Sequence, residues 1–275
     1  MSLTIRTNFS SLNAQRNLST TQSALDSSIS RLSSGMRITK AGDDAAGLGI
    51  STNLEAQVSS YNQAARNAND GISLAQTAEG SLNEVSNILS RLRDLAMQSA
   101  SDGVGSTQRT YITAEANQLQ SELDRIGLTA EFNGTTIFSA TTALRFQIGI
   151  RGTDNDYIQI DTTTMAISAA SLLTTGFDLS SVTLAANSLS LIDAAIDSVS
   201  GYRATLGAVG NRFQSVISSI KSASENLSAA DSRIRDVDVA EETSRLSRSQ
   251  ILAQAGVSVL AQANQLPQMA LKLLG

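Results

Sequence analysis

Acidic side chains are the residues of this sequence whose types and spacing come nearest to a chemical site. Asp154-Asn155-Asp156 resembles the start of a calcium loop, but the later spacing and the closing glutamate of such a loop are missing. Asp43-Asp44 and Glu241-Glu242 have the residue types of a catalytic acid and base. Neither pair has a nucleophilic or basic partner in a recognisable pattern. We therefore interpret the first run as a hairpin turn and the two pairs as helix caps and solvated charges.

The composition lacks the side chains that most enzymes and metal sites use. The 275 residues include no histidine and no cysteine, so the commonest general bases, thiol nucleophiles and metal ligands are missing. The formal net charge is −5 and the basic residues are scattered, which argues against a nucleic-acid partner. We predict that the protein is not an enzyme and binds no cofactor.

Neither a secretion signal nor a membrane span is predicted. Met1–Asn8 begins the chain without the long apolar core of a cleavable signal peptide, and no run reaches about 18 consecutive apolar residues. We expect no membrane insertion, and a protein that is either cytoplasmic or exported by a route that reads no such signal.

Regularly spaced apolar residues, called seams below, indicate the helices that position these side chains. Between Ile192 and Leu227, apolar residues recur in steps of three and four, which keeps a narrow stripe on one side of a helix. The same rhythm runs through Ala75–Ala96 and, over a shorter span, Ile112–Ile126. The sequence therefore predicts helices over 61–100, 108–127 and the long seam, packed as one antiparallel coiled-coil rod. Its expected core positions include Leu82, Leu89, Leu92, Leu206, Phe213 and Ile220.

The pattern changes in the middle of the chain. Apolar and polar residues alternate over 144–150 and again over 158–160, with the turn-rich run 152–156 between them. This alternation predicts a small β-hairpin. Residues 162–188 show no sustained period, and we expect a loop or a reduced distal segment there. Residues 44–58 are interrupted by two glycines and are expected to form a short helix or an irregular segment.

Two weaker seams lie near the two ends of the sequence. Both are diluted with polar and small residues, and isolated helices with few large apolar contacts are marginal in water. We expect these helices to become ordered only against other copies, so the predicted fold class is mainly α, with the termini paired as helices on assembly. The expected packing positions are Leu18, Leu25, Ile29, Leu32, Leu246, Ala253, Val257, Leu260 and Ala261.

Long strings near both ends closely resemble the bacterial flagellin family. The longest are Arg31–Leu48, Ala64–Gly80 and Val257–Gln268, and together the matching regions cover roughly 1–150 and 187–275 in the family's order. The resemblance implies a structural subunit that polymerises with itself into the hollow helical filament used for motility.

The resemblance also implies a division of the chain by filament layer. Residues 1–40 and 236–275 would pair as the innermost helical layer, and 41–150 with 187–235 would form the helical rod and hairpin of the next layer. Residues 151–186 would be a short variable segment, where family members often carry large outer domains.

Several partners follow from the resemblance. The family implies an extracellular filament, export by the flagellum's own type III apparatus, an export chaperone, a filament cap and hook-junction proteins. Leu89–Ala100 resembles the segment recognised by mammalian Toll-like receptor 5, and by position the main contact residues would be Arg91, Leu95 and Glu115. Leu95 lies off the apolar seam, so we expect it to face outward. Arg91 could also pair with a neighbouring subunit.

Two other interpretations remain open at this point. A flagellar hook-associated junction protein would share the terminal helices but would stay soluble on its own. A non-flagellar coiled-coil signalling module would be an ordered dimer with heptads running to both ends, whereas the terminal seams here are diluted. The family-like strings at both ends favour the filament subunit.

Overall fold

The structure, a computed structural model, describes residues 7–139, 143–173 and 176–274. The chain divides into two compact units. Unit 1 comprises Met1–Ala56 with Asn226–Gly275, and unit 2 comprises Gln57–Glu225. Each unit is described by itself below.

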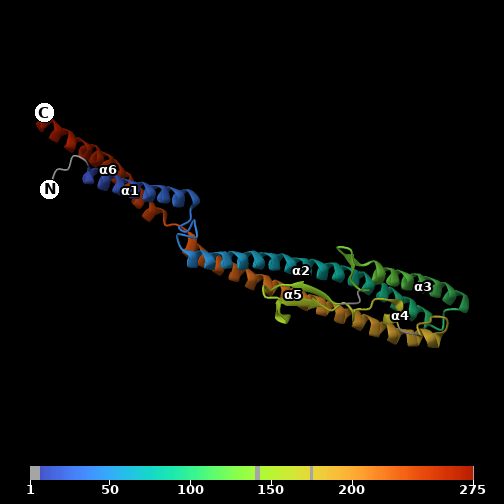
Figure 1. The fold of residues 1–275 in the computed structure, drawn as a ribbon. Coiled ribbons are helices and arrows are strands. Elements are labelled where there is room, and N and C mark those ends of the chain that lie inside the picture. Colours follow the sequence, from blue (N-terminus) through green and yellow to red (C-terminus); the bar gives the residue numbers. More distant parts are fainter. Residues whose placement is uncertain (1–6, 140–142, 174–175, 275) are drawn as a thin grey trace. The chain divides into compact units, whose positions relative to one another are not determined.

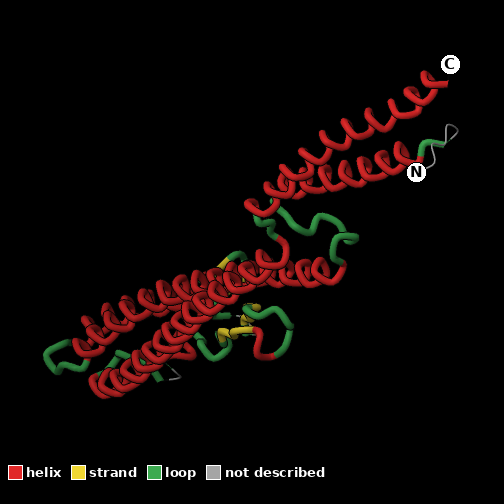
Figure 2. Tube along the Cα trace, turned by 90° about the vertical axis from the view of Figure 1, so that its left-hand side faces the viewer, coloured by secondary structure: helices red, strands yellow, loops and turns green. Residues whose placement is uncertain are grey.

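Long helices make up most of the described chain (Figure 1). They are α1 (Phe9–Ser34), α2 (Ala45–Ser99), α3 (Ser106–Thr129), α5 (Val182–Arg235) and α6 (Val239–Leu274). The remaining elements are the short helix α4 (Ala169–Leu172), the 3-10 turn η1 (Asp154–Asp156) and the strands β1 (Glu131–Phe132), β2 (Thr135–Thr136), β3 (Leu144–Gln147) and β4 (Tyr157–Ile160). Figure 2 shows the few strands beside the helices. The predicted mainly α class is confirmed.

Helices α2 and α5 run antiparallel through unit 2. Gly71 lies against Phe213, Glu79 pairs with Arg203 at 3.8 Å, and Arg93 pairs with Asp193 at 2.7 Å, so residue numbers rise on α2 as they fall on α5. By length and composition alone α5 could cross a membrane, but its buried residues lie on one stripe that faces the core of unit 2. The structure buries the expected rod-core residues Leu82, Leu89, Leu92, Leu206, Phe213 and Ile220.

The second half of α2 is buried on two adjacent stripes rather than one. Besides the seam, it buries Ile88, Leu95 and Ser99, because α2 has two neighbours. Arg93 reaches α5 on one side, and Arg91 reaches α3 on the other. Ser99 Oγ donates to the Leu179 carbonyl at 2.6 Å, so the chain that follows the hairpin covers the second stripe.

Residues 161–173 and 176–181 have no regular structure apart from the short helix α4, so the expected loop is confirmed there, although its apolar side chains pack into the core of unit 2. The Ile167 carbonyl lies so close to α3 that a Cβ on Gly127 would be 1.8 Å from its oxygen. Asp124 accepts a hydrogen bond from the Ala169 N–H at 2.7 Å. The expectation was wrong for 182–188, which are helical and belong to α5. The buried side chains of the segment include Thr162, Met165, Ile167, Leu172, Leu173 and Leu179.

The predicted hairpin is confirmed as β3 and β4, with Leu144 opposite Ile160 and Phe146 opposite Ile158. Strand β3 ends three residues before the alternating pattern does, and β4 begins one residue before its own. The Asp154–Asp156 run is a turn, in which the Thr153 hydroxyl and N–H donate to Asp156 at 2.7 and 2.9 Å and lower the pKa of that carboxyl. Within the described ranges, no group of three or more acidic residues is placed to hold a metal ion.

A phenylalanine pair anchors this hairpin to the rod. The ring of Phe146 on β3 meets the ring of Phe213 on α5 edge-on, with centroids 5.7 Å apart and planes at 89°. Phe213 lies against Gly71, where an added Cβ would come within 2.5 Å of the ring. Asn67 Nδ2 also donates to the Gln147 carbonyl at 2.9 Å. Gly71 lowers the helix propensity of α2, but its missing side chain leaves the space in which the Phe213 ring of the aromatic pair lies.

A second, shorter hairpin of β1 and β2 was not among our predictions. Its two-residue turn is Asn133-Gly134, with φ of 50° and 76°. Asn-Gly is the residue pair that suits a turn with positive φ at both central positions. The sequence therefore contained the turn signal of this hairpin, but the flanking strands are too short to show an alternation of apolar and polar residues.

In unit 1, α1 and α6 lie side by side and antiparallel (Figure 1). Asn8 Nδ2 donates to the Ala263 carbonyl at 2.7 Å at one end, and Arg31 faces Glu242 at 4.0 Å at the other. Between them, the Leu18 side chain lies where a Cβ on Gly256 would be 3.2 Å from it. Small residues of α6 therefore allow the two backbones to approach closely.

Two short connectors join the helices of unit 1, namely 35–44 and 236–238. The Arg37 N–H donates to the Arg235 carbonyl at 2.6 Å, and the Val237 N–H donates to the Gly35 carbonyl at 3.0 Å. These backbone hydrogen bonds tie the connectors to each other as a minimal antiparallel bridge.

Asp43 closes a turn within the first connector, and Asp44 caps the helix that follows it. Asp43 accepts from the N–H groups of Thr39 and Lys40 at 3.0 Å each, and its pKa is lowered mainly by the Thr39 N–H and hydroxyl and then by Lys40. Asp44 accepts from the Gly47 N–H at 2.8 Å, which confirms the predicted cap. Helix α2 then continues without a break, so the expectation of a short or irregular element over 44–58 was wrong.

Candidate interaction surfaces

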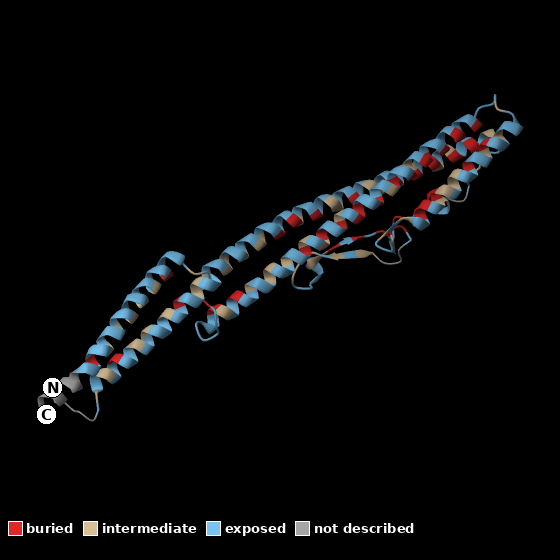
Figure 3. Cartoon of the chain, turned by 90° about the horizontal axis from the view of Figure 1, so that it is seen from above, coloured by how far each residue is buried: buried red, intermediate tan, exposed pale blue. Residues whose placement is uncertain are grey.

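Large apolar side chains are exposed mainly in unit 1. Figure 3 shows buried residues concentrated in the helices of unit 2, whereas α1 and α6 are largely exposed. The exposed large apolar residues of unit 1 are Phe9, Leu12, Ile29, Ile50, Val239, Ile251, Leu252, Val257 and Val259. Those of unit 2 are Met97, Tyr111, Leu128 and Leu184.

The nine expected packing positions of the terminal helices fall into two groups. Leu18, Leu25, Leu32, Leu246, Ala253 and Leu260 are half-buried. Ile29, Val257 and Ala261 are exposed, with 48% of Ile29 and 56% of Val257 open to solvent. The first group lines the contact within one chain, and the second group remains open.

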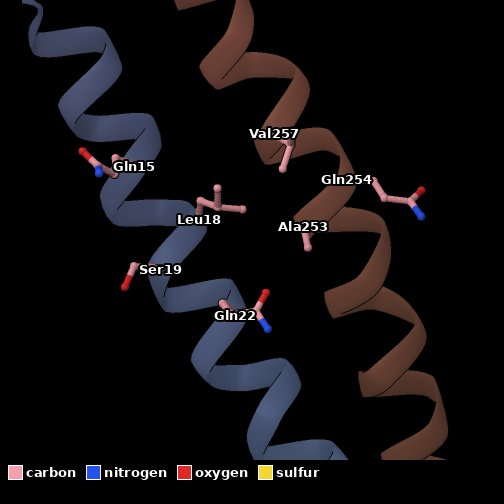
Figure 4. A pocket seen from close by; sticks show the side chains of 7 residues that line it. All are labelled: Gln15, Leu18, Ser19, Gln22, Ala253, Gln254 and Val257. Carbon is pink, nitrogen blue, oxygen red and sulfur yellow. The ribbon is translucent and has the colours of Figure 1, made fainter.

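An open groove runs between α1 and α6, with a volume of about 440 Å³. In Figure 4, Leu18 of α1 points toward Ala253 and Val257 of α6, while Gln254 points away. Gln15, Ser19 and Gln22 complete its lining. The groove thus combines an apolar floor with a rim of amides and a hydroxyl, and its shape suits an apolar side chain rather than a charged ligand.

Charge separates the two units as well. By sequence, unit 1 has 10 basic and 9 acidic residues and unit 2 has 10 basic and 16 acidic residues, which gives +1 and −6. Several charged residues of unit 1 are paired within the chain, including Arg235 with Glu55 and Arg245 with Glu241. Arg235 and Glu241, which belong to the charged run 231–242, therefore have partners in their own chain.

Arg91 and Glu115 form an ion pair between α2 and α3. Arg91 Nε and Nη2 lie 2.9 and 2.6 Å from Glu115 Oε1, and both side chains are about half exposed. Arg91 therefore has a partner within its own chain. Leu95 is only 2% exposed, so the expectation that it faces outward was wrong. It belongs to the second buried stripe of α2, which the single seam in the sequence did not reveal.

The sequence matches two family descriptions that together cover most of its length. The bacterial flagellin N-terminal helical region matches residues 5–143, and the bacterial flagellin C-terminal helical region matches residues 189–274. The chain belongs to the bacterial flagellin family. Flagellins are structural proteins, and the chain is accordingly a self-polymerising structural component of the extracellular flagellar filament.

Individual relatives agree with this membership over almost the whole chain. A flagellin of Halalkalibacterium halodurans is 41% identical over 271 residues, which cover 98% of this chain and 99% of that protein. A flagellin of Bacillus subtilis is 39% identical over 309 residues, with the same coverage of each chain. A solved structure of a putative flagellar hook-associated protein from Vibrio parahaemolyticus has a TM-score of 0.59 at 15% identity. It covers 70% of this chain and all of that one, and it shows the shared fold alone.

Proposed function

We propose that α1 and α6 of unit 1 form the surface through which each copy joins the filament and packs in its innermost layer. The observation that carries this proposal is the concentration of exposed large apolar side chains on these two helices. Each such side chain contributes on the order of 1.5–3 kcal/mol when it is buried, so a few of them per copy suffice for ordered addition. The near-neutral charge of unit 1 lets copies meet there with little net repulsion.

The contact between copies uses the positions that the single chain leaves open. Ile29 and Val257 supply apolar area, and Ala261 supplies a small surface that allows another helix to come close. The groove beside Leu18 gives a neighbouring side chain a place to insert. Residues 1–40 and 236–275 are therefore assigned to the inner layer, and 41–150 with 187–235 to the rod layer outside it. Residues 151–186 carry no large outer domain, so the filament surface is thin and smooth.

Seeded polymerisation tests this assignment. We expect the full-length chain to form long tubes on filament fragments, and a chain lacking residues 1–40 and 236–275 to form none. Sedimentation and electron microscopy measure the filaments, and far-UV circular dichroism controls for a folded helical rod in the shortened chain. Tubes from the shortened chain would refute the assembly surface. A full-length chain that stays soluble on seeds would favour the hook-junction interpretation.

The same exposed helices bear on how the subunit is delivered. We infer export through the flagellar type III apparatus without a cleavable signal, with an export chaperone covering α6 until secretion. Exposed apolar patches of this kind are aggregation liabilities unless a partner covers them. The filament cap and the hook-junction proteins would then contact the same unit at the two ends of the filament. No nucleic acid or membrane insertion enters this proposal.

We also propose that the monomer is a ligand of Toll-like receptor 5, through the surface that contains Arg91 and Glu115. The half-exposed ion pair between α2 and α3 supports this second function, since it presents a fixed arrangement of positive and negative charge. Leu95 would act from beneath this surface by supporting the contact between α2 and α3.

A receptor reporter assay with purified monomer tests the ligand function. We expect wild-type monomer to activate the receptor, and Arg91→Glu to lower the response at least tenfold, because it places two carboxylates opposite each other. The double variant Arg91→Glu/Glu115→Arg restores the pair with inverted polarity and serves as the matched control for folding. A silent wild-type monomer that is properly folded would refute the receptor function.

A further inference from the structure

We propose that the back of α6, the side that carries Arg248, Ile251 and Leu252, inserts Ile251 into the groove between α1 and α6 of the next copy. This inference rests on the assembly surface proposed above and names the two faces that meet in it. Ile251 is 66% exposed, more than any other large apolar side chain described on α6, and Leu252 is 52% exposed. The single chain therefore leaves two adjacent large apolar side chains open on this helix.

The helix register places Ile251 and the groove on different sides of unit 1. Ala253 and Val257 line the groove, and Ala253 follows Ile251 by two residues, which is about 160° around the helix. Ile251 therefore cannot reach the groove of its own chain, and a contact between its side chain and the groove has to join two copies. Because the two faces differ, this contact is heterologous. Repetition of a heterologous contact builds a ring or an open helical polymer rather than a two-fold dimer.

The groove suits an aliphatic side chain. Leu18, Ala253 and Val257 form its apolar floor, as Figure 4 shows. Ala253 has a single methyl group, so it leaves open a space that a larger residue would fill. Val257 is 56% exposed in the single copy. Insertion of Ile251 covers this valine, and apolar surface of both copies leaves water in one step.

Two residues of opposite charge support a second copy as the occupant. Arg248 lies three residues before Ile251 and lines the same shallow hollow on the back of α6. Asp26 follows Gln22 of the groove rim by four residues and accepts a hydrogen bond from its amide at 3.1 Å. Among the described residues, neither Arg248 nor Asp26 forms an ion pair. The inserted face and the groove therefore match in the sign of their free charges.

The spacing of these residues fixes the direction of the incoming helix. Arg248 precedes Ile251 by about 4.5 Å along α6, and Asp26 follows Gln22 by about 6 Å along α1. If Ile251 lies beside Gln22 and Arg248 meets Asp26, the incoming α6 runs antiparallel to the α1 that it contacts. It then runs parallel to α6 of the receiving copy, because α1 and α6 are antiparallel. Copies that add head to tail along a filament share one direction, so the charge pairing is consistent with filament growth.

Cysteine cross-linking of the full-length chain tests this contact, because the sequence has no cysteine of its own. Gln22→Cys/Ile251→Cys is grown on filament seeds, oxidised with diamide and separated on a non-reducing gel. A disulfide forms only where two Cα atoms come within about 7 Å. We expect a ladder of covalent trimers and larger species, since each copy bonds to two neighbours. The single variants are the matched controls. Each alone should stay monomeric, and their equimolar copolymer should stop at dimers.

Charge reversal tests the same contact without cysteine. Arg248→Glu places two carboxylates opposite each other, and Asp26→Arg places two guanidinium groups there. Each variant is expected to raise the critical concentration for seeded growth at least threefold, because like charges oppose each other across the contact. The double variant Asp26→Arg/Arg248→Glu restores opposite signs and should return to within about twofold of wild type. Far-UV circular dichroism of each monomer controls for folding.

The outcomes separate this inference from the assembly on which it rests. If the wild-type chain does not grow on seeds, the assembly surface falls and this inference falls with it. If the cysteine pair forms filaments without a ladder, only this inference falls. Dimers from Ile251→Cys alone mean that the backs of two α6 helices meet, which also overturns it. If the cysteine pair does not assemble, the double charge reversal decides. Restored growth supports the contact, and growth that stays impaired overturns it.

Discussion

Ala261→Trp is expected to abolish polymerisation of the full-length chain while its monomer stays folded. Ala261 is exposed on α6, whereas Ala263, two residues further on, is buried and its carbonyl accepts a hydrogen bond from Asn8 of α1. An indole at position 261 therefore leaves the pair of α1 and α6 undisturbed. Between copies it meets close-packed helices, where added bulk forces apart the contact on which addition depends. Seeded sedimentation and electron microscopy should show no filaments at concentrations where wild type forms them.

The control for this prediction changes the same position without adding bulk. Ala261→Ser should polymerise like wild type, and both variants should give the wild-type far-UV circular dichroism spectrum. Normal filaments from Ala261→Trp would place this face of α6 outside the contact between copies. If both variants failed to polymerise, the cause would be the chemical character of the side chain at position 261 rather than its size.

Phe213→Ala is expected to lower the free energy of unfolding of unit 2 by about 3–5 kcal/mol. The side chain is 0% exposed, lies against Gly71 of α2 and receives the edge of Phe146 from the hairpin. Its removal leaves a cavity that the rod helices fill poorly, since α2 has no side chain at position 71. It also removes the ring contact that holds β3 and β4 against α5.

Guanidinium unfolding followed by far-UV circular dichroism measures this loss. Gln214→Ala is the matched control, because Gln214 is the exposed next residue of the same helix and should shift stability by no more than about 0.5 kcal/mol. A loss below about 1 kcal/mol for Phe213→Ala would mean that the helices close around the missing ring, and that the hairpin is held by other contacts such as Asn67 with Gln147.

The regular helices could be predicted because their buried residues recur at a regular spacing along the sequence. Each turn of the seam from Ile192 to Leu227 places an apolar residue on the same side of the helix, so the pattern alone indicates one buried stripe. The pattern does not indicate how many neighbours a helix has. Leu95 lies outside the seam and is buried nevertheless, because α3 covers a second side of α2. The same three–four spacing is compatible with a helix that packs against one neighbour and with a helix that packs against two, and only the fold distinguishes these cases.

The irregular parts were harder to predict because their burial has no period. Met165, Ile167 and Leu179 are buried in a segment whose backbone groups bond to side chains of Asp124 and Ser99. Such contacts join positions far apart in sequence and leave no local trace.

Because α1 and α6 pair with each other, assembly through them requires a chain that contains both helices. Asn8 and Ala263, which are joined by a hydrogen bond, are 255 positions apart in sequence. A polypeptide that ends before α6 loses one partner of the helix pair, even where it keeps the rod helices of unit 2. Under the assembly proposed above, it therefore lacks the surface by which copies join. A growing filament would reject damaged subunits without any separate proofreading factor, because only an intact molecule carries both halves of the attachment surface.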